Sequence, residues 1–237
     1  MNYIEKALNT IDFDINSNSK YINSKGLKVP RVTEIISRTV HNDSLMYWAN
    51  HLGFKGLRYK QVLNEAARFG TVAHESIELF LKEKIKTDSN IPFLGFLQWY
   101  NTITKELNIP IEILNVELSL CCDWFGGTLD ALLNIGGRVY LVDFKTSNHV
   151  TFNYFLQLAA YRYMLKIIKG IDIDGVIVLQ LGKQECGFSE YLLDFSIPDH
   201  LVFINNCEIT FLSLVYSYYN LNKIESEFKD IFRRNLE

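Results

Sequence analysis

The spacing of the apolar residues changes near residue 110, and this change narrows the folds that the chain can adopt. Before it, apolar residues recur every three or four positions, which is typical of helices. Residues 111–118 and 128–145 instead alternate or form short apolar runs, as strands do. Residues 151–169 return to helical spacing, and strand-like runs follow at 175–181 and 190–195. We therefore expect an α/β fold, close to α+β, with a central mixed β-sheet flanked by helices.

Turn and cap residues set the boundaries of several expected elements. Gly136-Gly137 predicts a tight turn between strands 128–135 and 138–145, and Gly126-Gly127 is expected to break the strand region before them. Thr33 is the expected N-cap of a short helix after Pro30. The other helices are expected at 44–52, 59–84, 93–107 and from about 198 to the end.

The chain is expected to form a single domain. Its 237 residues are 48% hydrophobic, and they contain no internal repeat and no Pro/Ser-rich linker. We divide it into an N-terminal helical extension at 1–58, a core at 59–195 and C-terminal helices at 196–237. No apolar run approaches the length of a membrane span, and the start lacks the pattern of a secretory signal. A cytoplasmic location without membrane attachment is the expectation.

The charge is unevenly distributed along the chain. A net charge of −3 by itself disfavours a nucleic-acid partner. However, residues 1–86 hold 13 Lys+Arg and 9 Asp+Glu, whereas residues 87–237 hold 11 and 18. Four basic residues cluster near Phe54 and Tyr59: Lys55, Arg58, Lys60 and Arg68. Such a cluster is either a solvated helix face or a track for phosphates.

Asp143-Phe144-Lys145 follows an apolar run and places two opposite charges on one face of a strand. Taken alone, this pattern is usually a surface ion pair. Counting outward from the glycine turn places Asp130 near Asp143, and Glu117 on the preceding strand could reach the same edge. Two carboxylates at one level of a hairpin need a cation or a shared proton between them. A shifted register that separates them is the alternative.

Two helices contribute further polar residues. His74 lies on the 59–84 helix, one turn after Gly70, and is either a packed residue or a metal ligand. On the helix after Lys145, Tyr154, Gln157 and Tyr161 share one face because they are spaced at i, i+3 and i+7. That polar stripe is either a solvated edge or part of a site.

The order of these motifs resembles the PD-(D/E)xK nuclease superfamily. The sequence contains Gly-x-x-x-His-Glu on a helix, then Glu117, Gly-Thr-Leu-Asp, Asp-Phe-Lys-Thr and Gln-x-x-x-Tyr. The likeness runs from about Pro30 to Tyr161 and is closest to the RecB-like exonuclease branch, which includes Cas4-type, mitochondrial genome-maintenance and phage exonucleases. Val29-Pro30-Arg31-Val32-Thr33 also looks like the "PSVT" opening of the phage and mitochondrial members, with Arg31 in place of the small residue.

The resemblance implies a restriction-endonuclease-like core and a set of roles. His74, Asp130, Asp143 and the Phe144 carbonyl would hold one or two Mg²⁺ or Mn²⁺ ions, with Glu117 as a direct ligand, a ligand through water or an orienting residue. Lys145 would orient the attacking water and offset negative charge, or assist deprotonation if burial lowers its pKa. Gln157 and Tyr161 would hold the scissile phosphate or the lysine. Thr146 and the four clustered cations would contact DNA.

The cysteines separate this chain from the iron–sulfur members. Those relatives use one cysteine before the histidine motif and three near the C-terminus. Here the first cysteine is Cys121, its neighbour is Cys122, and only Cys186 and Cys207 follow the lysine. We therefore expect free thiols and no iron–sulfur cluster.

The resulting expectation is a metal-dependent DNA exonuclease in phage or bacterial recombination, replication or repair. Its partners would be DNA ends, single- or double-stranded, and a single-strand-annealing or replication protein. A structure-selective DNA endonuclease and a non-catalytic DNA-binding module on the same fold are the alternatives.

Overall fold

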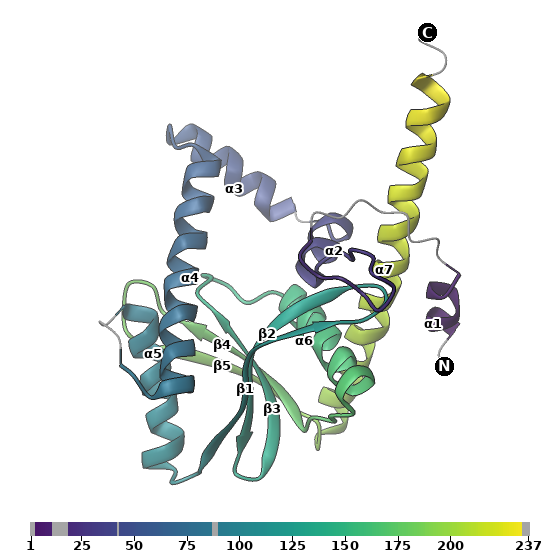
Figure 1. The fold of residues 1–237 in the computed structure, drawn as a ribbon. Helices are drawn as coiled ribbons and strands as arrows, with labels where there is room; N and C mark the ends of the chain where they lie inside the picture. The colour runs from purple at the N-terminus through teal and green to yellow at the C-terminus, as the bar shows by residue number, and fades with distance from the viewer. Residues whose placement is uncertain (1–2, 11–18, 42, 87–89, 234–237) are drawn as a thin grey trace.

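The computed structural model describes residues 3–10, 19–41, 43–86 and 90–233, and its centre is a five-stranded mixed sheet. The strands lie side by side in chain order (Figure 1). They are β1 (Ile111–Cys121), β2 (Gly126–Ile135), β3 (Arg138–Lys145), β4 (Gly175–Leu181) and β5 (Phe188–Asp194). All neighbours are antiparallel except β3 and β4, which are parallel and are joined by the helix α6 (Phe152–Met164).

Helices cover both faces of the sheet (Figure 1). On one face, α6 and α7 (Pro198–Arg233) pack on a cluster that includes Leu129, Val178 and Phe211. On the other face, α4 (Tyr59–Glu83) and α5 (Ile91–Asn101) pack on a cluster that includes Phe96 and Phe144. A π-helical turn follows α5 at Thr102–Glu106 and another follows α6 at Leu165–Lys169. The sheet is therefore the middle of three layers.

The N-terminal part of the chain also contributes to the first cluster. The short helices α1 (Tyr3–Leu8) and α2 (Val32–Thr39) place Leu8, Val32 and Ile35 fully buried beside α6 and α7. Between them, residues 21–29 form a small turn in which Ile22 pairs with Lys28. The expected division of the chain at residue 58 stays a prediction, because packing alone does not say which part folds independently.

Two helical segments project beyond the sheet (Figure 1). The helix α3 (Asp43–Phe54) and the first half of α4 form one arm, in which Trp48 and Tyr59 make an edge-to-face contact. The last turns of α7 form the other. Within the described residues, no helix has the length and apolar character needed to cross a membrane.

The expected fold class, a mixed sheet flanked by helices, is confirmed. Most expected elements match the observed ones, and the end of the chain forms one helix, α7, rather than several. Two local predictions are wrong. Gly126 and Gly127 begin β2 instead of breaking the strands, because their bare backbones pair with β1. The N-cap of α2 is Arg31 rather than Thr33, and its side chain makes no capping hydrogen bond.

Candidate metal centre

Asp130 and Asp143 lie at one level of the β2–β3 hairpin, as the turn predicts. The turn residues Gly136 and Gly137 both have positive φ, and the last paired rung is Ala131 with Val142. Continued by one residue on each strand, this register places Asp130 opposite Asp143, where the ladder itself has ended. The Asp130 carboxylate accepts a hydrogen bond from the Phe144 backbone N–H at 2.8 Å. This bond holds Asp130 against the strand that carries Asp143 and Lys145.

Three side chains from different elements meet at this level. One ligand atom each from His74 of α4, Glu117 of β1 and Asp130 of β2 lies within 4.8 Å of the others. The Nδ1 atom of His74 is 3.7 Å from Asp130 Oδ2, and its Nε2 atom is 3.0 Å from the Phe144 carbonyl oxygen. The side chains of Phe144 and His74 also make an edge-to-face contact. We call His74, Glu117 and Asp130 the metal triad.

Glu117, the member of the metal triad on β1, has a strained backbone conformation. Its φ is 52°, in the left-handed region that non-glycine residues rarely adopt. The β1–β2 register also shifts shortly before it in the strand, between Ile113 and Asn115. Such strain costs on the order of 1–3 kcal/mol and is concentrated at functional sites. Burial, and then the Asp130 charge, raises the pKa of Glu117.

The donor set of the metal triad fits a hard divalent cation. Its two carboxylates, those of Glu117 and Asp130, have oxygens within 4.8 Å of each other, and a cation between them removes their repulsion. Carboxylate oxygens suit Mg²⁺, and an imidazole nitrogen in the set also suits Mn²⁺.

Beside the metal triad, Asp143 and Lys145 form a buried ion pair. The Lys145 ammonium donates to Asp143 Oδ1 at 2.9 Å and lies 2.7 Å from Oδ2, and Asp143 is only 1% exposed. Burial raises the pKa of Asp143 to about 6, although Lys145 opposes the shift. Burial also acts to lower the pKa of Lys145, but the charges of Asp143 and Asp130 outweigh it, so the pKa is raised. Lys145 is therefore a charged ammonium group. This disfavours the expected role in which Lys145 helps to deprotonate the attacking water, because that role needs a lowered pKa.

The helix α6 completes the network around this pair. Gln157 Nε2 donates to Asp143 Oδ1 at 3.2 Å and to the Tyr161 hydroxyl at 3.3 Å, and its Oε1 accepts from Lys145 at 3.4 Å. Tyr161 packs directly over Gly127 of β2, where a Cβ atom would lie 2.5 Å from the tyrosine ring. The absence of a side chain at Gly127 thus sets how closely α6 approaches the sheet.

The Tyr154 ring is a contact of Lys145 that sequence reasoning did not assign. The Lys145 Nζ atom lies 4.9 Å from the centroid of this ring, a cation–π distance. The signal was present in the sequence, since Tyr154 shares the helical face of Gln157 and Tyr161. Only the position of the lysine shows what the ring touches.

Three of the four predicted DNA-contacting cations lie together. Arg58, Lys60 and Arg68 line one shallow depression on the arm that α3 and the first half of α4 form. Lys55 follows α3 and is not among the residues that line this depression. Thr146 lies beside Gly70, where a Cβ atom would be 3.4 Å from its hydroxyl oxygen. That is an ordinary van der Waals distance, so α4 passes close to the end of β3 here without requiring a glycine.

The four cysteines are free thiols at three places in the fold. Cys121 and Cys122 follow each other at the end of β1, Cys186 lies exposed between β4 and β5, and Cys207 is buried on α7. Burial raises the pKa of Cys122 to about 12 and that of Cys207 to about 11.

Comparisons with known proteins give distant structural similarities only. No family model matches the chain, and no curated protein matches it. The crystal structure of SSO0001 is 14% identical in sequence, with 89% of this chain and 82% of that chain covered and a TM-score of 0.34. That of a phage related exonuclease from Haemophilus somnus is 10% identical, with 65% and 82% covered and a TM-score of 0.31. Similarities this distant carry no argument about activity.

Proposed function

We propose that this protein is a metal-dependent deoxyribonuclease that hydrolyses phosphodiester bonds, and that it acts as an exonuclease. One observation carries the proposal: a buried Asp143–Lys145 pair lies directly beside the metal triad, joined to it by the backbone of Phe144. The alternative for Asp143-Phe144-Lys145 was an exposed ion pair with no catalytic role. Asp143 is almost fully buried, which does not fit that alternative. The resemblance of the motif order to RecB-like exonucleases supports the exonuclease form.

His74, Glu117 and Asp130 would hold the cation, and the Phe144 carbonyl lies against His74. Asp143, which the resemblance also implied as a ligand, is not a member of that group and is paired with Lys145 instead. When bound, a hard divalent cation supplies charge stabilisation at the phosphoryl oxygens and makes water more acidic. The Phe144 backbone contacts two members of the metal triad at once. Its carbonyl oxygen contacts His74 Nε2, and its N–H donates to Asp130.

Lys145 would stabilise the negative charge that develops on the phosphate. Its ammonium is held by Asp143, Gln157 and the Tyr154 ring, so its position is set before the substrate arrives. A fixed cation in a site that excludes water is worth more than a mobile one, because little reorganisation is needed at the moment of reaction. Asp143 would keep the lysine charged rather than act as a base.

Gln157 would position rather than react. It contacts Asp143, Lys145 and Tyr161 together, and thereby links the ion pair to the helix α6. Replacing Gln157 by Ala would leave two buried charges with fewer hydrogen bonds. We expect a lower turnover with little change in substrate affinity, because the side chain acts through Lys145.

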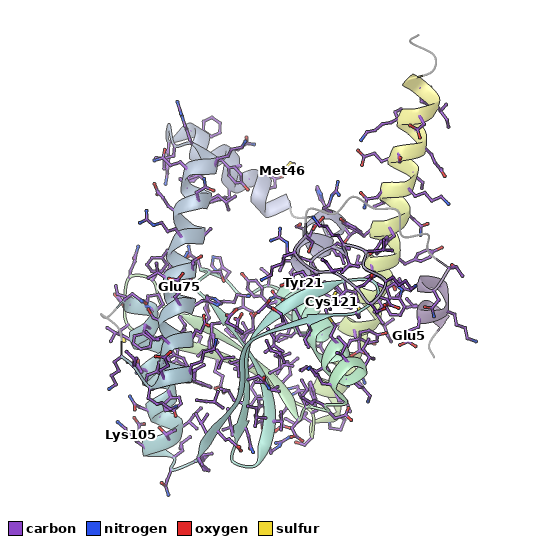
Figure 2. The ribbon with its side chains drawn as sticks, in the orientation of Figure 1. Glu5, Tyr21, Met46, Glu75, Lys105 and Cys121 are labelled. Atoms are coloured by element: carbon purple, nitrogen blue, oxygen red, sulfur yellow. The ribbon has the colours of Figure 1, made fainter. Side chains whose placement is uncertain are left out.

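The test is digestion of end-labelled linear and circular DNA, single- and double-stranded, with Mg²⁺ or Mn²⁺. The proposal expects loss of linear DNA from its ends, no cleavage after EDTA treatment and no cleavage by Lys145→Met. Lys105→Met is the matched control, because Lys105 is exposed at the opposite end of the molecule (Figure 2). Intact DNA with both metals would overturn the proposal, and cleavage of closed circles would favour an endonuclease.

A further inference from the structure

The open face of the β1–β2 ribbon carries a second polar rung directly beyond the metal triad. Glu117 and Asp130 are followed, two residues further along each strand, by Ser119 and Thr128, which pair in the ladder. Two residues span about 7 Å of strand. Ser119 Oγ and Thr128 Oγ1 are 2.9 Å apart, and the Tyr21 hydroxyl lies 2.8 Å from the same Thr128 oxygen. We call Tyr21, Thr128 and Ser119 the hydroxyl row.

The hydroxyl row has one more donor than it uses. Three hydroxyl groups carry three protons, and the row makes two internal hydrogen bonds. Whichever way the bonds run, one hydroxyl of the row keeps a proton for an acceptor outside it. When Tyr21 donates to Thr128 and Thr128 donates to Ser119, that proton is on Ser119, which is exposed and can present it to a ligand, whereas Tyr21 is buried.

The segment that supplies Tyr21 is firmly anchored. Tyr21 packs on Gly126, where a Cβ atom would lie 2.4 Å from the ring, and Asn23 donates to the Asp123 backbone carbonyl at 3.1 Å. Arg31 forms a bridge with Gly126 at the start of β2. Figure 2 shows Tyr21 and Cys121 close together on the ribbon between the two projecting arms.

Three exposed cations surround the hydroxyl row. Lys20 Nζ lies 5.4 Å from the Tyr21 ring centroid, Lys28 belongs to the same small turn, and Arg31 adjoins Gly126. Within the described part of the chain, none of the three forms an ion pair. Asp123, between β1 and β2, accepts a hydrogen bond from Ser24, and the carboxylates of Glu117 and Asp130 lie two residues from the row on its metal-triad side. The side of the row that faces residues 20–31 is therefore the positively charged one.

We propose that the hydroxyl row, with Lys20, Lys28 and Arg31, binds the backbone phosphates of the DNA strand next to the one cleaved at the metal triad. This inference rests on the proposed function and adds the path of the strand along the β1–β2 ribbon. A spare hydroxyl donor and unpaired cations are the groups that bind phosphate without reading sequence. The strand would thus leave the metal triad towards residues 20–31.

The experiment measures binding of a fluorescein-labelled single-stranded oligonucleotide by anisotropy, in EDTA, over a range of salt concentrations. Lys20→Ala/Arg31→Ala should lower the slope of log K against log salt by about 1.4, since each lost contact to a single strand removes about 0.7. Ser119→Ala should weaken binding about tenfold, because it removes a hydrogen bond to a charged group. Lys105→Ala/Lys169→Ala removes the same charge near the other end of the sheet from the hydroxyl row and should leave the slope as in the wild type.

The outcomes separate this inference from the proposed function. If the wild type binds and cuts DNA but Lys20→Ala/Arg31→Ala keeps the wild-type slope, the strand path is wrong and the nuclease remains. A wild type that neither binds nor cuts DNA overturns both. Retention of the Mn²⁺-induced thermal shift in the double variant shows that its metal triad is intact.

Discussion

The buried Asp143–Lys145 pair allows folding and catalysis to be measured separately. In Lys145→Met the side chain keeps a similar length and apolar volume, so little cavity forms, but Asp143 loses the cation within 3 Å of both its oxygens. Breaking a buried pair by removing one partner costs about 3–5 kcal/mol. We therefore expect Lys145→Met to lower the free energy of unfolding by about that amount near pH 8.

The penalty should depend on pH in a defined direction. Burial already raises the pKa of Asp143 to about 6, and loss of Lys145 raises it further. An acid whose pKa is higher in the folded than in the unfolded state makes the fold less stable as the pH rises from about 4 through the folded value. The cost of Lys145→Met should therefore be small near pH 4, grow with pH, and level off above the raised pKa.

The double variant Asp143→Asn/Lys145→Met removes both charges together. Neutral replacement of a buried pair is often tolerated, so its free energy of unfolding should return to within about 1–2 kcal/mol of the wild type. Urea unfolding followed by tryptophan fluorescence measures all three chains at several pH values. The double variant should be folded and still fail to cut DNA. A cost below about 1 kcal/mol for Lys145→Met at pH 8, or no change with pH, would refute the reasoning.

Further predictions concern a close contact, thiol reactivity and a helix cap. Gly127→Ala should cost about 1–3 kcal/mol in urea unfolding and lower the cleavage rate, because its Cβ atom would overlap Tyr161; an unchanged rate would mean that this contact does not position α6. At pH 8 a thiol reagent should modify exposed Cys186 quickly, whereas Cys122, whose pKa burial raises to about 12, should react only when the chain unfolds; fast labelling of Cys122 would contradict its burial. Asn90→Ala should lower the melting temperature by an amount equivalent to about 1–2 kcal/mol, because it removes the cap on α5; no change would show that the cap is replaced by water.

The placement of Asp130 beside the strand that carries Asp143 could be predicted because it depends on local chemistry. Two adjacent glycines fix a two-residue turn, and the turn fixes the register of both strands. His74 could be placed only through the resemblance of the motif order. Its spacing on α4 shows which face it occupies, but not that this face lies against Phe144.

The position of Glu117 at the site could not be predicted from local sequence patterns. The β1–β2 register shifts before it, and its backbone leaves the strand conformation, so counting from a turn does not reach it. The prediction that Gly126 and Gly127 break the strand was wrong because of contacts distant in sequence. Tyr21 and Tyr161 pack where side chains at these positions would be, and this packing overrides the weak strand preference of glycine. Arg58, Lys60 and Arg68, which are close in sequence, also line one depression in the structure.

The positive φ of Glu117 also bears on how this protein can be engineered. Glycine adopts that conformation without the steric cost that glutamate carries, so Glu117→Gly relieves strain while it deletes a member of the metal triad. A library selected for thermal stability alone would therefore tend to enrich changes at this position, and the enriched chains would have lost their metal ligand. Selection on stability and on metal retention together would be needed to keep it.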